Sequence, residues 1–306
     1  MARRKKNKNL KGIPAAIMLI LALIGGFAER GNLMERMSGE PAQNIADTVA
    51  TGQMKVTYLN VGQGDCTIIQ TEGHNAMIDA GNNHEGKDVV DYLNQQGIDK
   101  LDYLILTHPD ADHIGGGDDV LEKIEVEQVI MPDVANDTMT YEEVMDDIEK
   151  ENVPVEHPKV GEEFEFGDAT FTVLCPETDL VSSDDTNDAS VGIKLVHGEN
   201  SFVMCGDASE NSESAMVKRF GSALECDVLK CGHHGSRTST SEVFLKATNP
   251  TWAVISCGVD NSYGHPHQET LERLNNDDVQ VYRTDLLGTI IATSDGTNIS
   301  WFSEKE

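Results

Sequence analysis

Metal-ligating side chains that directly follow apolar runs constrain this chain more than any other feature. The run LDYLILT ends in HPDADHIGG, so two histidines and two aspartates lie within positions 108–113. Polar residues with Pro and Gly commonly mark a turn, which explains the polarity of this segment but not its spacing. Imidazole nitrogens and carboxylate oxygens together suit Zn²⁺, Mn²⁺ or Fe. Because one short loop cannot close a metal site, we expect further ligands at other strand ends.

Other predicted strand ends supply such groups. Asp207 ends the segment FVMCGD, His233 and His234 lie in KCGHHGS, and His265 and His267 lie in YGHPH. Several independent ligand-rich segments that each end an apolar run are difficult to explain as solvated turns. We therefore expect these segments to meet at one site.

The hydrophobic periodicity predicts an α/β domain. The runs in MKVTYLNVGQGDCTIIQT and HNAMIDAG indicate a β-meander. Helical spacing is found in KDVVDYLNQQGI, YEEVMDDIEKE, NSESAMVKRFG, TSEVFLKAT and HQETLERLNN. Strands are predicted in LDYLILT, EQVIMP, ATFTVLCP, SVGIKLVHG, NSFVMCGD, CDVLKCGHHG, TWAVISCG, VQVYRTD and GTIIATSDG. Strands and helices alternate without an internal repeat, which favours two sheets with outer helices.

The N-terminal part differs from the rest. Residues 1–12 form a basic flank, residues 13–28 are apolar, and residues 29–53 are polar with little periodicity. A basic flank before an apolar run is typical of a signal peptide or a membrane anchor, and the length of the run fits either. We expect a linker at 29–53 and a folded domain at 54–306 that is extracytoplasmic, either membrane-anchored or secreted.

Charge and cysteine usage narrow the function classes. Residues 1–30 carry seven Lys or Arg and one acidic residue, so the chain total of −30 leaves −36 for residues 31–306. So acidic a domain repels polyanions, which argues against tight non-specific binding of nucleic acid unless bound divalent cations reverse the field locally. The six cysteines form no CxxC pair, and several lie in apolar runs, so we expect buried free thiols.

Taken together, Asp79 in IDAG, the HPDADH segment, Asp207 in CGD and the HHGS segment resemble the metallo-β-lactamase superfamily. The segments LNVGQGDCTII, THPDADHIGG, LKCGHHGS and YGHPH are most similar to the branch that contains the hydrolase-like domain of the DNA-uptake channel protein ComEC. The resemblance covers about residues 54–290. It implies a metallo-β-lactamase-like αββα sandwich, with two mixed sheets and outer helices, preceded by the N-terminal hydrophobic segment.

The resemblance also implies a site with two divalent metal ions, zinc or manganese. The implied ligands are His108 and Asp110 for the first ion, Asp112 and His113 for the second, Asp207 as a bridge, and His234, preferred over His233, to complete the second position. Asp79 would orient the segment HPDADH, residues 108–113, which we call the metal loop, without binding metal itself.

The catalytic group implied by the resemblance comprises Asp112, His233, His265 and His267. A water between two cations loses a proton near neutral pH and becomes the nucleophile. His265 or His267 would then protonate the leaving group or hold its oxygen.

The sequence departs from the family pattern in two places. Asp110 stands where the most familiar form of the metal loop has histidine, and this harder ligand shifts the preference towards manganese. The segment DDTNDASVGIKLVHG, with Asn187 and Ser190, has no histidine where many family members have a ligand. We therefore expect one metal position to be more open or weaker.

Two further features each have two interpretations. Lys230 ends a predicted strand, where it would contact a phosphate or, more ordinarily, be solvated at a sheet edge. Gly62 and Gly64 in NVGQGD allow either a close backbone approach to the metal centre or a tight hairpin.

These observations favour an exported metal-dependent hydrolase of phosphodiesters, with single-stranded DNA as a candidate substrate in competence-type DNA processing. Small phosphodiesters, such as a nucleotide or choline phosphate on a cell-wall polymer, and other esters are the alternatives within the enzyme class. A non-catalytic metal-containing binding protein of DNA uptake is the alternative outside it. A degenerate binding module should have lost some of the residues His108, Asp112, His113, Asp207 and His234, and all five are present, so the sequence favours an enzyme.

Overall fold

The computed structural model describes residues 49–182 and 185–305. The predicted membrane anchor or signal segment and its basic flank lie outside these ranges, as does most of the predicted linker. Within the described ranges, no helix is long and apolar enough to cross a bilayer.

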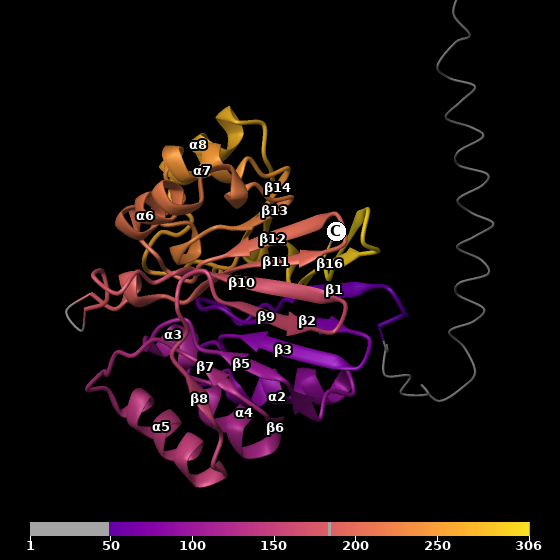
Figure 1. Cartoon of the computed structure of the whole chain (residues 1–306), viewed down its shortest axis with the longest axis vertical. Helices are drawn as coiled ribbons and strands as arrows, with labels where there is room; N and C mark the ends of the chain where they lie inside the picture. The colour runs from indigo at the N-terminus through magenta and orange to yellow at the C-terminus, as the bar shows by residue number, and fades with distance from the viewer. Residues whose placement is uncertain (1–48, 183–184, 306) are drawn as a thin grey trace, which may run out of the picture. The chain divides into compact units, whose positions relative to one another are not determined.

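Two mixed sheets form the centre of the described fold (Figure 1). The first has the strand order β17-β16-β1-β2-β3-β5-β7-β8. Its strands are β1 Met54–Tyr58, β2 Thr67–Thr71, β3 His74–Ile78, β5 Tyr103–Ile105, β7 Val129–Ile130, β8 Val155–Glu156, β16 Ile290–Ser294 and β17 Ile299–Ser303. Neighbours from β17 to β3 are antiparallel and those from β3 to β8 are parallel. The predicted meander of the first three strands is thereby confirmed.

The second sheet has the order β15-β14-β13-β12-β11-β10-β9. Its strands are β9 Glu163–Phe166, β10 Ala169–Cys175, β11 Gly192–His197, β12 Asn200–Met204, β13 Val228–Lys230, β14 Trp252–Ile255 and β15 Gln280–Arg283. Neighbours from β12 to β15 are parallel, so the carboxyl ends of these strands lie along one edge of the sheet. A separate two-stranded sheet pairs β4 Lys100–Leu101 with β6 Glu125–Val126.

Helices cover the outer face of each sheet (Figure 1). On the first sheet lie α2 Gly86–Gln95, α4 Gly117–Lys123 and α5 Met139–Glu151, and on the second lie α6 Glu210–Phe220, α7 Glu242–Thr248 and α8 Gln268–Asn276. The short helices α3 Ala111–Ile114 and α9 Thr284–Leu287 follow β5 and β15. In α2, Val89, Val90 and Leu93 recur at helical spacing and are buried against the sheet.

Three apolar clusters correspond to the three interfaces of a four-layer fold. The central cluster lies between the sheets and joins side chains of both, for example Tyr58 and Ile105 from the first sheet with Phe171 and Phe202 from the second. The outer clusters join each sheet to its own helices. The expected two-sheet α/β architecture with outer helices is therefore confirmed for the described residues.

The expectation for the cysteines is also confirmed. All six thiols are buried and free, namely those of Cys66, Cys175, Cys205, Cys226, Cys231 and Cys257. Burial raises the pKa of the Cys231 and Cys257 thiols to about 12. These cysteines therefore act as small apolar core residues and carry no charge near neutral pH.

Candidate metal centre

The predicted ligand segments meet where strands of both sheets end. HPDADH follows β5 of the first sheet, Asp207 follows β12 of the second, and His233 and His234 follow β13. Because β12 and β13 are parallel neighbours, their carboxyl ends lie next to each other at the same edge of the second sheet. The site is thus built from elements that lie far apart in the sequence.

The first residues of the metal loop, up to Asp110, are not helical, and its last residues lie in α3. Asp110 has extended backbone angles at the amino end of α3, and Asp112 and His113 lie within that short helix. The rings of His108 and His113 approach to 4.1 Å between centroids. His108 Nδ1 lies 3.1 Å from Thr107 Oγ1, while its Nε2 lies 3.8 Å from Asp110 Oδ2. The Nε2 face of His108 is therefore directed towards the loop carboxylate.

Asp79 makes hydrogen bonds to the segment that carries His108 and His113. Its Oδ1 accepts the backbone N–H of Thr107, and its Oδ2 accepts both the Thr107 hydroxyl and Nδ1–H of His113, all at 2.8 Å. The carboxylate is only 1% exposed. Because Nδ1 of His113 is used in this way, its Nε2 is the nitrogen that faces the centre of the cluster.

Asp207 occupies the middle of the site. Its Oδ1 lies 3.2 Å from His113 Nε2 and its Oδ2 lies 3.5 Å from His233 Nε2. Neither Oδ1 nor His113 Nε2 has hydrogen-bond geometry with any partner. Asp207 therefore lies between an imidazole that follows a strand of the first sheet and one that follows a strand of the second.

His234 is oriented in the same way as His113. Its Nδ1 donates to the carbonyl of Ser256 at 3.0 Å, so its Nε2 is free to face Asp112 at 3.2 Å and Asp207 at 3.8 Å. The side chain is 1% exposed, whereas that of His233 is 26% exposed. Of the two neighbouring histidines, His234 belongs to the buried floor of the site and His233 to its rim.

Asp65, at the end of NVGQGD, is a member of the cluster that the sequence did not reveal. The four residues with ligand atoms within 4.8 Å of one another are Asp65, His113, Asp207 and His234. The Asp65 backbone N–H donates to the carbonyl of Asp112 at 3.0 Å. A Cβ on Gly64 would lie 2.6 Å from the same carbonyl oxygen, so the close-approach interpretation of this glycine is correct.

Lys230 is buried, and the interpretation of a solvated lysine at a sheet edge is wrong. Its strand, β13, lies inside the second sheet, between β12 and β14. The Lys230 ammonium pairs with Asp65, and both side chains are at most 5% exposed. This places a fixed positive charge beside a cluster of carboxylates, where it offsets the cost of burying them.

The charges in the cluster depend strongly on one another. Burial would raise the pKa of Asp207, but His113 and His234 outweigh it and hold that pKa well below its usual range. Burial would lower the pKa of His113, but Asp207 and Asp79 raise it well above its usual value. Metal binding must therefore displace protons from imidazoles that the carboxylates stabilise.

His265 and His267 lie beside the cluster and differ in their contacts. Burial, with the neighbouring His234 and His233, lowers the pKa of His265 to about 4, so this ring is neutral near pH 7. Its Nδ1 is buried without a partner. His267 Nδ1 accepts the backbone N–H of Arg237 at 3.1 Å, which ties the HHGS loop to the start of α8.

The unpaired buried atoms fit a metal ion. Buried polar atoms without a hydrogen-bond partner include Nε2 of His108, His113 and His234 and Oδ1 of Asp65 and Asp207. Each such atom costs about 1–3 kcal/mol when nothing satisfies it, and a cation satisfies several at once. Nitrogen and carboxylate donors together are the ligand set of zinc and manganese proteins.

Comparison with known proteins agrees with this geometry. Residues 59–259 match the family model of the Metallo-beta-lactamase superfamily. The chain is 32% identical over 254 residues to ComE operon protein 3 of Bacillus subtilis (strain 168), covering 77% of this chain and 32% of that protein. It is 30% identical over 245 residues to competence protein ComA of Neisseria gonorrhoeae, covering 80% of this chain and 33% of that protein. The chain thus spans about a third of the length of these relatives.

Solved structures support the same fold at low sequence identity. CmlA, a diiron β-hydroxylase from Streptomyces venezuelae, superimposes with a TM-score of 0.52 at 12% identity, covering 75% of this chain and 52% of CmlA. The metallo-β-lactamase fold protein YhfI from Bacillus subtilis superimposes with a TM-score of 0.50 at 14% identity, covering 76% and 95% of the two chains. The matched family segment includes the metal loop, Asp207 and the HHGS loop, so the chain belongs to the metallo-β-lactamase superfamily.

Proposed function

We propose that this protein is an exported hydrolase of phosphodiesters that uses two divalent metal ions and acts on single-stranded DNA. The observation that carries the proposal is the convergence of unpaired imidazole and carboxylate atoms from both sheets. The family membership and the similarity to proteins named for competence support it. The extracytoplasmic location rests on the basic flank and apolar run of the sequence.

The charge of the site supports two cations. Its carboxylates are Asp65, Asp79, Asp110, Asp112 and Asp207, and the lysine that pairs with this set is Lys230. Five carboxylates against one ammonium leave four negative charges, which two divalent ions would balance. In this assignment His108 and Asp110 would hold one ion, Asp112, His113 and His234 would hold the other, and Asp207 would contribute to both positions.

The residues around the cluster suit hydrolysis of an anionic ester. Bound cations supply Lewis acidity and an acidified water at such a site. The side chains of Asp110, Asp112 and His233 are 39%, 29% and 26% exposed, so substrate can reach the cluster from this side. In this proposal His233 would hold a phosphoryl oxygen, and the neutral ring of His265, whose centroid lies 5.4 Å from that of His233, would hold the leaving oxygen through an N–H hydrogen bond.

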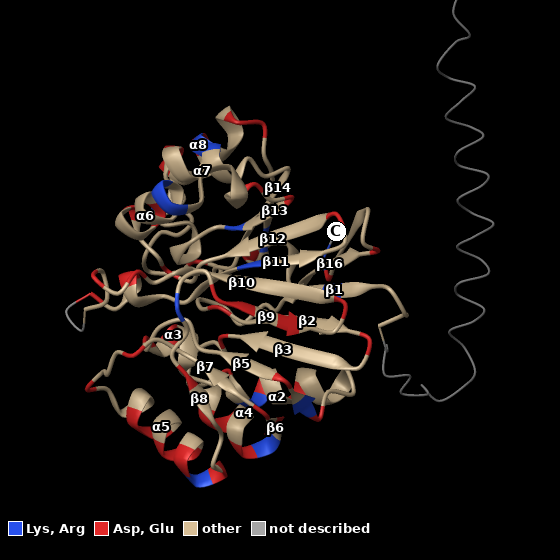
Figure 2. Ribbon diagram, in the orientation of Figure 1, with Lys and Arg blue, Asp and Glu red and all other residues tan. Residues whose placement is uncertain are grey.

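The acidity of the surface bears on the size of the substrate. Figure 2 shows acidic residues in red on many elements, with several on α5. A clamp on long DNA requires a basic surface, so we propose that the enzyme takes short single-stranded segments. The same acidity favours a second candidate, a small phosphodiester, over a polymer.

The decisive experiment is metal-dependent cleavage of 5′-labelled single-stranded DNA by the full chain, with Mn²⁺ or Zn²⁺ restored after chelation. Asp112→Asn removes the charge of a ligand and is expected to lower the rate by at least about 100-fold, the scale of losing one electrostatic contact at a reacting centre. Asp91→Asn on α2 is the matched control, because Asp91 is exposed and its carboxylate lies 3.9 Å from the ammonium of Lys87, away from the site.

One outcome of this experiment would contradict the proposal. If the protein binds both metal ions and leaves DNA intact, the nuclease proposal is wrong. Turnover of a chromogenic diester such as bis(p-nitrophenyl) phosphate under those conditions would then identify the protein as a hydrolase of small phosphodiesters.

A further inference from the structure

An exposed aromatic side chain lies beside the metal centre. Tyr263, in the loop between β14 and α8, is 64% exposed. Its ring stacks on His265 with centroids 5.6 Å apart and planes 21° apart. His265 in turn stacks on His234 at 6.2 Å and 26°. Three nearly parallel rings therefore lead from the solvent-exposed Tyr263 to a residue of the buried cluster.

The loop that carries Tyr263 is held in place by its own hydrogen bonds. Asn261 Nδ2 donates to the carbonyls of Gly258 and His265 at 2.9 and 2.6 Å, and Asn261 Oδ1 accepts the backbone N–H of His265 at 2.9 Å. Gly258 N–H donates to Gln63 Oε1 at 3.1 Å, which joins the loop to the segment that bears Asp65. The backbone that carries the Tyr263 ring is thus held by several hydrogen bonds. A ligand that binds to this ring therefore causes little loss of conformational entropy in the loop.

We propose that Tyr263 is a stacking platform for a nucleobase of the substrate whose phosphodiester lies at the metal centre. This inference rests on the proposed function and narrows its substrate class to phosphodiesters that carry bases. Every base has a π-face, so an aromatic ring binds single strands without reading their sequence. It also supplies affinity that a domain with a charge of −36 cannot obtain from basic residues.

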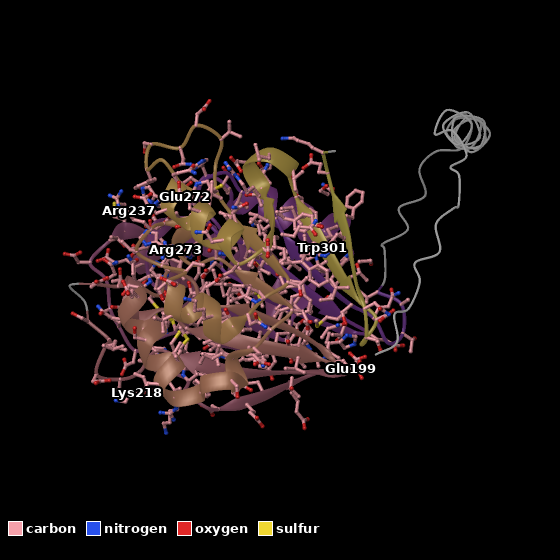
Figure 3. All side chains as sticks on the ribbon, turned by 90° about the horizontal axis from the view of Figure 1, so that it is seen from above. Glu199, Lys218, Arg237, Glu272, Arg273 and Trp301 are labelled. Carbon is pink, nitrogen blue, oxygen red and sulfur yellow. The ribbon has the colours of Figure 1, made fainter. Side chains whose placement is uncertain are left out.

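The charges around this rim are mixed. Figure 3 shows Arg237 and Arg273 with Glu272 on one side of the molecule. The side chain of Arg237 is 61% exposed and lies 3.7 Å from Glu269. Its backbone bond to His267 places it in the loop that follows the two site histidines. This part of the molecule therefore carries arginines as well as acidic residues.

The test compares two substrates and three variants of the full chain. The substrates are octathymidine and an octamer of the same backbone with tetrahydrofuran abasic units. Tyr263→Ala is expected to lower kcat/KM for octathymidine by about tenfold or more, the scale of losing one base–aromatic stack, and to leave the abasic octamer unaffected. Tyr263→Phe should retain the activity of the parent chain. The matched control is Phe302→Ala, since Phe302 is 63% exposed on β17 and is not part of the site.

A binding measurement separates this inference from the proposed catalysis. Fluorescence anisotropy of the metal-loaded protein with fluorescein-labelled, phosphorothioate-linked forms of both octamers requires no turnover. If octathymidine binds more tightly than the abasic octamer and Tyr263→Ala removes the difference, stacking stands even where neither octamer is cleaved. Equal binding of the two octamers by the parent chain, or an unchanged preference in Tyr263→Ala, overturns the inference whether or not cleavage is seen.

Discussion

Asp79 shows how a buried carboxylate can orient a neighbouring imidazole of the candidate metal centre. Its two oxygens accept three hydrogen bonds, two from Thr107 and one from Nδ1 of His113. Only a carboxylate accepts on both oxygens, so the identity of this residue fixes the tautomer of the imidazole. When the His113 ring is neutral, its free electron pair is thereby on Nε2, which faces Asp207.

Asp79→Asn should therefore weaken metal binding without unfolding the protein. The amide nitrogen donates where the carboxylate oxygen accepts, so His113 Nδ1 must become an acceptor and its proton moves to Nε2. We expect metal affinity to fall by about 10–100-fold. Competition with a chelator measures the affinity, and circular dichroism checks the fold. An affinity equal to that of the Asp91→Asn control would contradict this role for Asp79.

The sequence motifs indicated most of the residues that the structure brings together, but they did not indicate Asp65. The segments HPDADH, MCGD and HHGS supplied the predicted residues that the structure brings together. Asp65 follows two glycines of a turn, which gave it no distinguishing mark. Its position depends on a backbone bond to the Asp112 carbonyl and a pair with Lys230, contacts that join distant parts of the chain.

At the scale of elements, α6 and α7 are joined by a buried carboxyl group. Glu213 of α6 accepts the backbone N–H groups of Thr240 and Ser241, the latter at 2.8 Å, where α7 begins. The side chain thus satisfies donors that a helix start leaves unpaired. Burial, opposed by these hydrogen bonds and by Arg273, raises the pKa of Glu213 to about 7.

This helix connection should make stability depend on pH. Between about pH 4.5 and 7 the folded chain holds the Glu213 proton more tightly than the unfolded chain. The free energy of unfolding therefore falls as pH rises through this window, by about 1.4 kcal/mol per unit for this group, and levels off above it. Denaturant unfolding from pH 4.5 to 8 should show this slope in the parent chain and lose it in Glu213→Gln. Parallel curves for the two proteins would contradict the prediction.

Periodicity located most elements but not their order. Each predicted helix is present, as are the strands from β10 to β16, because each has a clear apolar pattern of its own. The sequence did not indicate β9, β17 or α3, which are short or lie near the surface. The strand order could not be derived from the sequence. For example, β15 belongs to the second sheet, but the next strand, β16, belongs to the first sheet and pairs with β1, so that Ser294 lies opposite Met54. Such register depends on long-range packing.

At the scale of the whole molecule, the metal centre joins the two sheets. His108 and His113 follow a strand of the first sheet, while Asp207 and His234 follow strands of the second. Without a cation, the buried unpaired atoms of these residues oppose the packing of one sheet edge on the other. A bound ion would reverse that balance, so occupancy of the site and stability of the fold would be linked.

Metal addition should therefore raise the melting temperature of the full chain, and titration should show two classes of site. An ion whose free concentration is 100 times its dissociation constant adds about 2.7 kcal/mol to the free energy of unfolding.

The tighter class of site is expected at Asp112, His113 and His234, because the segment around Ser190 contributes no histidine to the His108 side of the cluster. Asp207→Asn should lose most of the metal-induced shift in both classes, since Asp207 lies between ligands of both sheets. A melting temperature that does not respond to Zn²⁺ or Mn²⁺, with binding confirmed by calorimetry, would place the metal outside this junction.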